Sequence, residues 1–316
     1  MEHASLILNQ TLPILLLILL GAWMRRTRFL SEETFEELKK LVVGAALPAA
    51  LFLSFLEIRL EASYLAIFVL IPVLCVGLYL LGLAVRRSIG GGREYSPFLM
   101  TGFEYGMLGV SLFGSAYGID KIGYIAVIAL GHEIFIWFIF LSLLLAKRDG
   151  AQSPGKLVKV FARSPVIIAI ALGVACNLIA SKEALWGAPV LGAVMTSLKF
   201  LSGMTIPLIL LIVGYGIRFE EEGFSQAVKT ACFRMAVLIP LALAVNVLFI
   251  RGLLGLSRPF EVALFTLFIL PPPFIIPLYM RPGVSSERRY VLNALTVNTV
   301  LSLIVFAIYL ALNPTL

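Results

Sequence analysis

The sequence is poor in charged residues. Asp, Glu, Lys and Arg together make up 14 % of its 316 residues, whereas hydrophobic residues make up 60 %. Water-soluble domains usually carry about 25 % charged residues, and the mean hydropathy of this chain is +1.00. The composition therefore excludes a water-soluble globule and indicates an integral membrane protein.

Cysteine and histidine are also scarce. Cys75, Cys176 and Cys232 lie inside apolar segments, without the paired spacing of a disulfide framework or a zinc knuckle. The stretch HEIFI from His132 lacks the second histidine of zinc proteases, and the sequence contains no GxxxxGKS nucleotide loop. We expect no metal or cofactor beyond a sodium ion or proton used for coupling, and any transport would draw its energy from a gradient.

Ten apolar segments separated by short polar joints divide the chain. A bilayer core about 30 Å thick requires roughly 20 apolar residues per helix, and the segments are 16 to 30 residues long. The first segment lacks a basic start and a cleavage site, so we expect a retained helix. The segments are 5–24, 41–56, 63–85, 96–117, 122–146, 163–181, 188–217, 226–250, 259–280 and 289–312.

The basic residues are sorted between the joints. Of the 25 Lys and Arg residues, we assign 19 to the first, third, fifth, seventh and ninth joints. Cytoplasmic joints of membrane proteins are enriched in Lys and Arg. The sorting predicts a multi-pass protein of the cell (inner, cytoplasmic) membrane with both termini on the non-cytoplasmic side. It explains the basic charge without a nucleic-acid partner.

The two halves of the chain repeat one another. Residues 40–61 recur at 199–220, and the spacing of Pro13 and Gly21 recurs as Pro165 and Gly173. Seven positions of the first match are identical: Lys40/Lys199, Gly44/Gly203, Pro48/Pro207, Leu51/Leu210, Ile58/Ile217, Arg59/Arg218 and Glu61/Glu220. Such repeats are typical of transporters built from two related bundles.

Each repeat contains five segments, which is an odd number. The second repeat must therefore enter the membrane from the opposite side, so we expect an all-α protein of ten transmembrane helices in two inverted five-helix repeats. The first repeat covers residues 1–148, a cytoplasmic linker covers 149–160, and the second repeat covers 161–316. This arrangement predicts a substrate site near the middle of the membrane.

The fourth and ninth segments contain helix-breaking residues. The fourth is rich in glycine, and the ninth contains Pro271, Pro272 and Pro273, which cannot all lie inside a helix. When Pro97 is aligned with Pro259, residues 109–111 face the three prolines. Non-helical backbone inside a membrane requires protein or water to satisfy its polar groups. We therefore expect a polar cavity between two interruptions, whose helix ends would suit an anion or a coupling ion.

Three ionisable residues are predicted to lie well inside the apolar spans. Glu104, His132 and Glu133 are candidates for ion coupling, because a charge inside a membrane costs about 2.5–3.5 kcal/mol on insertion scales. For Glu104 the alternative is a structural hydrogen bond to interrupted backbone, and for His132 it is a hydrogen bond between helices. Glu133 is preferred over His132 for the cavity, because adjacent helical residues point about 100° apart.

Substrate binding requires further polar or small residues near the interruptions. Hydroxyl and amide side chains there could hydrogen-bond a carboxylate, although each could equally join two helices. The candidates are Thr101, Tyr105, Gly106, Gly109, Ser111, Pro271, Pro272, Pro273 and Asn298.

Four stretches of the sequence resemble the auxin efflux carrier family, which includes bacterial malonate-type carriers. They are LPILLLILLGAWMRR from Leu12, LVVGAALPAALFLS from Leu41, TGFEYGMLGVSLFG from Thr101 and LPPPFIIP from Leu270. The resemblance implies a fold similar to bile-acid sodium symporters and sodium/proton antiporters, with broken fourth and ninth helices that cross and an elevator-like movement. Family members usually carry Asn at the crossover, where this sequence has Glu104.

The leading hypothesis is a secondary active transporter, not an enzyme. Its substrate would be a small organic anion, a carboxylate, with coupling to protons or sodium through Glu104. The alternatives are a membrane-embedded enzyme, which would need a fuller catalytic constellation than His132 and Glu133, and a channel or receptor. The expected partners are the anion and the lipid bilayer, and a homodimer is left open.

Overall fold

The computed structural model describes residues 2–57, 61, 63–149, 162–179, 182–219, 221–281 and 283–316. The regular structure of these residues is entirely helical, which confirms the all-α prediction. Nearly all of the predicted linker, and Ile58, Arg59 and Glu220 of the repeat, lie outside the described residues.

The helices follow the apolar segments of the sequence. In the first half they are α1 (Glu2–Arg26), α2 (Glu32–Leu41), η1 (Val42–Ala46), α3 (Leu47–Glu57), α4 (Ser63–Ala84), α5 (Ser96–Met100), η2 (Tyr105–Gly109), α6 (Val110–Tyr117), η3 (Ile119–Lys121), α7 (Ile122–Ile134), η4 (Phe135–Phe140) and α8 (Leu141–Asp149). In the second half they are α10 (Pro165–Ile179), α11 (Lys182–Gly187), α12 (Pro189–Gly216), α13 (Phe224–Val245), η5 (Asn246–Leu253), α14 (Arg258–Ile269), η6 (Ile276–Leu278) and α15 (Ser285–Leu312).

Six helical runs among the described residues are long and apolar enough to cross a membrane. They are Glu32–Glu57, Tyr64–Ala84, Ile119–Arg148, Pro189–Gly216, Phe224–Leu253 and Ser285–Leu312. Helix α10 is apolar but shorter, and the predicted fourth and ninth spans are each interrupted. The chain thus has the helices of a multi-pass membrane protein, whereas the arrangement as ten spans in inverted repeats stays a prediction.

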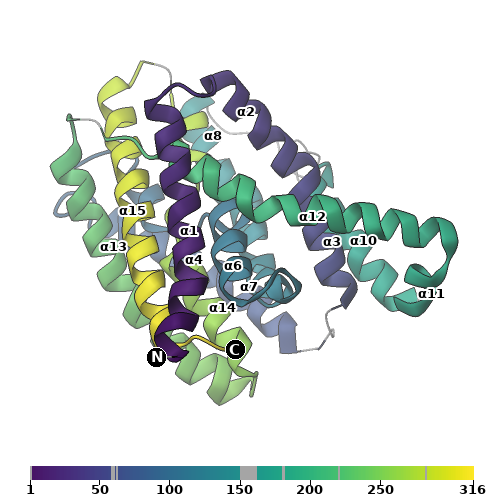
Figure 1. The fold of residues 1–316 in the computed structure, drawn as a ribbon. Helices are drawn as coiled ribbons and strands as arrows, with labels where there is room; N and C mark the ends of the chain where they lie inside the picture. Colours follow the sequence, from purple (N-terminus) through teal and green to yellow (C-terminus); the bar gives the residue numbers. More distant parts are fainter. Residues whose placement is uncertain are drawn as a thin grey trace.

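Two long helix pairs pack through glycine. Helix α1 lies along α12, and α3 lies along α10; in Figure 1, α12 runs from α11 at one edge of the molecule toward α1. A Cβ atom on Gly21 would lie 2.1 Å from the Leu211 carbonyl oxygen, and one on Gly173 would lie 2.7 Å from the Phe52 carbonyl oxygen. Small residues permit such backbone approach between membrane helices.

These two contacts are equivalent under the sequence repeat. Gly173 is the counterpart of Gly21, and Phe52 is the counterpart of Leu211 in the matched segments. The same close approach therefore occurs once in each pair of helices, with the roles of the two halves exchanged. The division of the chain into two related halves stays a prediction.

Candidate functional site

The first interruption separates α5 from η2. Helix α5 ends at Met100, and Thr101 is already extended, with φ −128° and ψ 166°. Gly102 has φ +69°, and a Cβ atom there would lie 2.8 Å from Cγ of Pro273. Both the left-handed backbone and this close approach require glycine. Gly102 is therefore the residue at which the chain leaves the helix.

The second interruption follows α14. This helix ends at Ile269, Leu270 is extended with φ −64° and ψ 151°, and the three prolines are buried in non-helical backbone. The triple-proline break is thus where the sequence predicts it, because proline has no amide hydrogen for a helix bond.

The two interruptions meet through Glu104. Its backbone amide donates to the carbonyl oxygen of Pro271 at 2.8 Å, and its carboxylate Oε2 accepts from the amide of Phe274 at 2.7 Å. Backbone groups that are freed in one half are therefore satisfied by the other half. This is the structural hydrogen bond that the sequence analysis left open as an alternative for Glu104.

The predicted position of the first interruption is wrong. Gly109 closes the π-helical turn η2, and Val110 and Ser111 begin α6, so none of them forms a break opposite the prolines. The Ser111 hydroxyl donates to the Met107 carbonyl at 2.7 Å, which is an ordinary intrahelical bond. Glycine is tolerated inside a packed membrane helix, and the actual break at residues 101–104 lies about two turns earlier.

His132 and Glu133 adjoin the first interruption from α7. His132 is 1 % exposed, and its Nε2 accepts from the amide of Phe103 at 2.8 Å. The proton of a neutral imidazole must then be on Nδ1, which lies 3.4 Å from Oε1 of Glu133. Oε2 of Glu133 accepts from Nε1 of Trp137 at 3.1 Å. The geometry favours the helix-joining interpretation of His132.

Arg234 of α13 is a functional candidate that the sequence analysis missed. It is 0 % exposed, and its guanidinium donates to the carbonyls of Leu99, Gly102 and Leu270 at 3.0, 2.7 and 3.1 Å. The prediction of only three ionisable residues inside the spans is therefore wrong, and the count of cytoplasmic charges wrongly included Arg234. The signal was one arginine ten residues into the apolar run that starts at Phe224.

Some of the remaining predicted binding residues bond backbone carbonyls, and others have a buried polar atom without a partner among the described residues. Thr101 donates to the Cys75 carbonyl at 2.6 Å, and the Asn298 amide donates to the Ala294 carbonyl at 2.7 Å. Tyr105 Oη and Asn298 Oδ1 are buried without a hydrogen-bond partner among the described residues. Of the glycines, Gly109 lies against the second interruption, because a Cβ there would be 2.7 Å from Leu270 Cδ1, whereas Gly106 faces Leu47.

We call the two bonded interruptions, residues 101–104 and 270–274, the crossover. A cavity of about 330 Å³ lies on its predicted cytoplasmic side. Met107 and Phe274 connect its wall to the two interruptions. Three cationic side chains and one carboxylate line it, and the rest is mostly apolar. The lining consists of Glu36, Lys39, Met107, Ile212, Val213, Gly216, Ile217, Arg218, Phe274, Pro277, Leu278, Arg288, Leu292, Leu295, Thr296 and Thr299.

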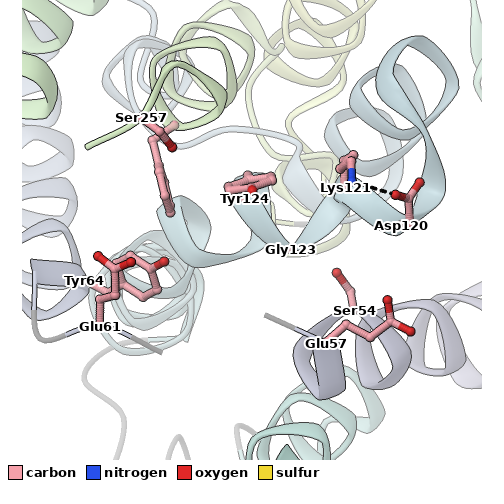
Figure 2. A pocket seen from close by; sticks show the side chains of 10 residues that line it. Ser54, Glu57, Glu61, Tyr64, Asp120, Lys121, Gly123, Tyr124 and Ser257 are labelled. Carbon is pink, nitrogen blue, oxygen red and sulfur yellow. Dashed lines mark ion pairs between the residues drawn. The ribbon is translucent and has the colours of Figure 1, made fainter. Parts of the chain in front are cut away.

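A second cavity, of about 300 Å³, is lined mainly by residues of the opposite, predicted non-cytoplasmic ends of the helices. Figure 2 shows side chains from the end of α3, the start of α4 and the start of α7, with Asp120 and Lys121 forming an ion pair at 2.9 Å. Three carboxylates oppose one lysine here. The lining consists of Ser54, Glu57, Glu61, Tyr64, Asp120, Lys121, Gly123, Tyr124, Ser257 and Phe260. None of the predicted site residues lines either cavity.

Comparison with known proteins indicates a membrane transporter. Residues 6–156 match the family described as membrane transport protein. A protein of Methanothermobacter thermautotrophicus named "Uncharacterized transporter" is 28 % identical over 253 residues, which cover 78 % of this chain and 80 % of that protein. The resemblance to the auxin efflux carrier-like transporters is confirmed. The transporter family and the relative's name both indicate membrane transport rather than an enzyme.

Glu104 stands where these transporters usually carry asparagine, as the resemblance implies. An asparagine can bond the same backbone groups but cannot change its charge. In this chain two ionisable groups bond the interrupted backbone: the carboxylate of Glu104 and the guanidinium of Arg234.

Proposed function

We propose that the chain is a secondary active transporter that carries a small organic anion, a carboxylate, across the cytoplasmic membrane. The observation that carries this proposal is the crossover between two cavities at opposite helix ends. Interrupted helices near the middle of the membrane are the usual binding region of secondary transporters.

The charge of the cytoplasmic-side cavity favours an anion. Lys39, Arg218 and Arg288 face it together with one carboxylate, Glu36. Lys39 pairs with Glu36 at 3.3 Å and Arg218 pairs with Glu32 at 2.7 Å, so the positive charge of the lining exceeds the negative charge but is partly compensated. An excess of one sign of charge along a cleft raises the local concentration of the opposite ion. The apolar remainder of the wall suits the carbon skeleton of an organic acid rather than an inorganic ion.

Glu104 is the proposed coupling residue. Its carboxylate accepts the Phe274 amide, so its charge acts directly on the contact between the two interruptions. A hydrogen bond to an ionised carboxylate is roughly twice as strong as one between neutral groups. Protonation of Glu104 would therefore weaken the contact, which links proton binding to rearrangement of the crossover.

The glycine-packed pairs are the proposed scaffold of an elevator movement. Helices α1 and α12, and α3 and α10, approach at backbone distance through Gly21 and Gly173. Such contacts tolerate little sliding, because packed backbones have no side chain that can adapt. The helices that carry the crossover, α5, α6 and α14, would move against this scaffold.

Uptake by proteoliposomes tests the proposal. We expect proteoliposomes that contain the purified protein to accumulate labelled malonate or another small carboxylate. The rate of uptake should saturate with substrate concentration, and internal unlabelled anion should exchange for external labelled anion. Matched assays with empty liposomes and with the uncharged diamide of the substrate are the controls. Uptake without exchange or saturation would instead favour a channel, and chemical conversion of the substrate would favour an enzyme.

A further inference from the structure

Arg234 has no carboxylate partner among the described residues, although its side chain is wholly buried. Its three hydrogen bonds all go to backbone carbonyls of the crossover. Two of these carbonyls mark helix ends, because Leu99 lies in the last turn of α5 and Leu270 follows the last residue of α14. The third belongs to Gly102, in the left-handed turn between them.

Each carbonyl carries partial negative charge that the interrupted helices leave unsatisfied. The last four carbonyls of a helix lack partners inside the helix, and the dipole of the 12-residue helix α14 adds partial negative charge at its end. The ring of Phe103 adds its negative face, with its centroid 5.3 Å from Cζ of Arg234. The guanidinium thus occupies a pocket of negative potential that two half-helices build together.

Unwound carbonyls and half-helix C-terminal ends are also the groups that coordinate sodium in transporters with broken helices. We infer that Arg234 is a tethered cation that takes the place of an alkali-metal ion at the crossover, so that sodium does not bind there. Arg234 is then a positioning residue that holds the ends of α5 and α14 together. The consequence for coupling rests on the proposed transport function and leaves a proton at Glu104 as the coupling ion.

The first test compares ions on the unaltered protein. We expect the thermal midpoint of the purified protein in detergent to be the same in sodium chloride and in choline chloride at equal ionic strength, because the cation site is already filled. A midpoint that rises with sodium concentration would overturn the inference. This measurement requires no variant and no substrate.

The second test removes the cation. Arg234→Ala is expected to lower the midpoint by roughly 5 °C or more, because three buried carbonyls lose their donors. Millimolar guanidinium chloride, far below denaturing concentrations, should recover at least half of that loss. The matched control is Arg251→Ala, which removes an exposed arginine that pairs with Glu261; guanidinium should not raise its midpoint. A destabilised Arg234→Ala that guanidinium leaves unchanged would contradict a tethered cation.

A third comparison covers the case in which Arg234→Ala does not fold. Arg234→Lys keeps a cation and Arg234→Gln keeps a polar side chain without charge. We expect the lysine variant to be the more stable of the two, and equal stability would overturn the inference. None of these measurements uses a transported substrate, so a failure to find carboxylate uptake would count against the proposed function alone.

Discussion

Gly214→Ala is expected to destabilise the protein by about 3 kcal/mol, at the upper end of the usual cost of overpacking. A Cβ atom at Gly214 would lie 1.9 Å from the carbonyl oxygen of Ile18, which is backbone and cannot rotate away. Helix α1 would have to separate from α12 over this contact. Reversible unfolding in detergent, or the thermal midpoint where unfolding is irreversible, measures the change.

Gly203→Ala, in the same helix, is the matched control. Gly203 is exposed, and nothing lies within 4 Å of a Cβ atom built there. Alanine is favoured over glycine inside a helix by roughly 0.5–1 kcal/mol, so this variant should be as stable as the unaltered protein or slightly more stable. Equal behaviour of the two variants would show that the close packing of α1 and α12 does not support the fold.

Glu104→Gln should abolish transport driven by a proton gradient while leaving exchange of the anion intact. Glutamine retains an acceptor for the Phe274 amide but cannot take up a proton. With one proton carried per anion, each unit of pH difference supports an internal anion concentration about tenfold above the external one. In the variant the two concentrations should become equal. Uptake into proteoliposomes with and without an imposed pH gradient measures the ratio.

The same substitution at Glu94 controls for loss of a carboxylate. Glu94 lies in the joint between α4 and α5 and pairs with Lys147 at 3.2 Å, and Lys147 holds the pKa of this carboxyl below its usual value. Glu94→Gln should keep the full gradient dependence, because Glu94 pairs with Lys147 rather than with the backbone of either interruption. If Glu104→Gln also kept it, Glu104 would be a structural residue only.

Local chemistry made part of the crossover predictable. Three consecutive prolines exclude a helix whatever surrounds them, so the second interruption follows from Pro271–Pro273 alone. Glycine is different, because it is accepted both inside and outside helices. Only the contact with Pro273 and the positive φ of Gly102 distinguish it from Gly109, and both depend on tertiary structure.

Arg234 shows a second limit of sequence reasoning. An arginine within about 15 residues of a cytoplasmic joint is usually counted with that joint. Its burial depends on the carbonyls of Leu99 and Leu270, which are 135 and 36 residues away in the sequence. The two cavities could not be predicted from the sequence either. Arg218 lines one cavity and Asp120 lines the other, and each meets its neighbours in the lining only in the folded chain.

Accessibility of the two cavities tests most directly that the crossover separates compartments on opposite membrane faces. Leu292→Cys reports on one cavity and Asp120→Cys on the other, each in a protein whose Cys75, Cys176 and Cys232 have been replaced. A membrane-impermeant maleimide, added to intact cells or to inverted vesicles, should modify Leu292→Cys only from the cytoplasmic side and Asp120→Cys only from the opposite side. Modification of both positions from the same side, or of either position from both sides, would contradict the account.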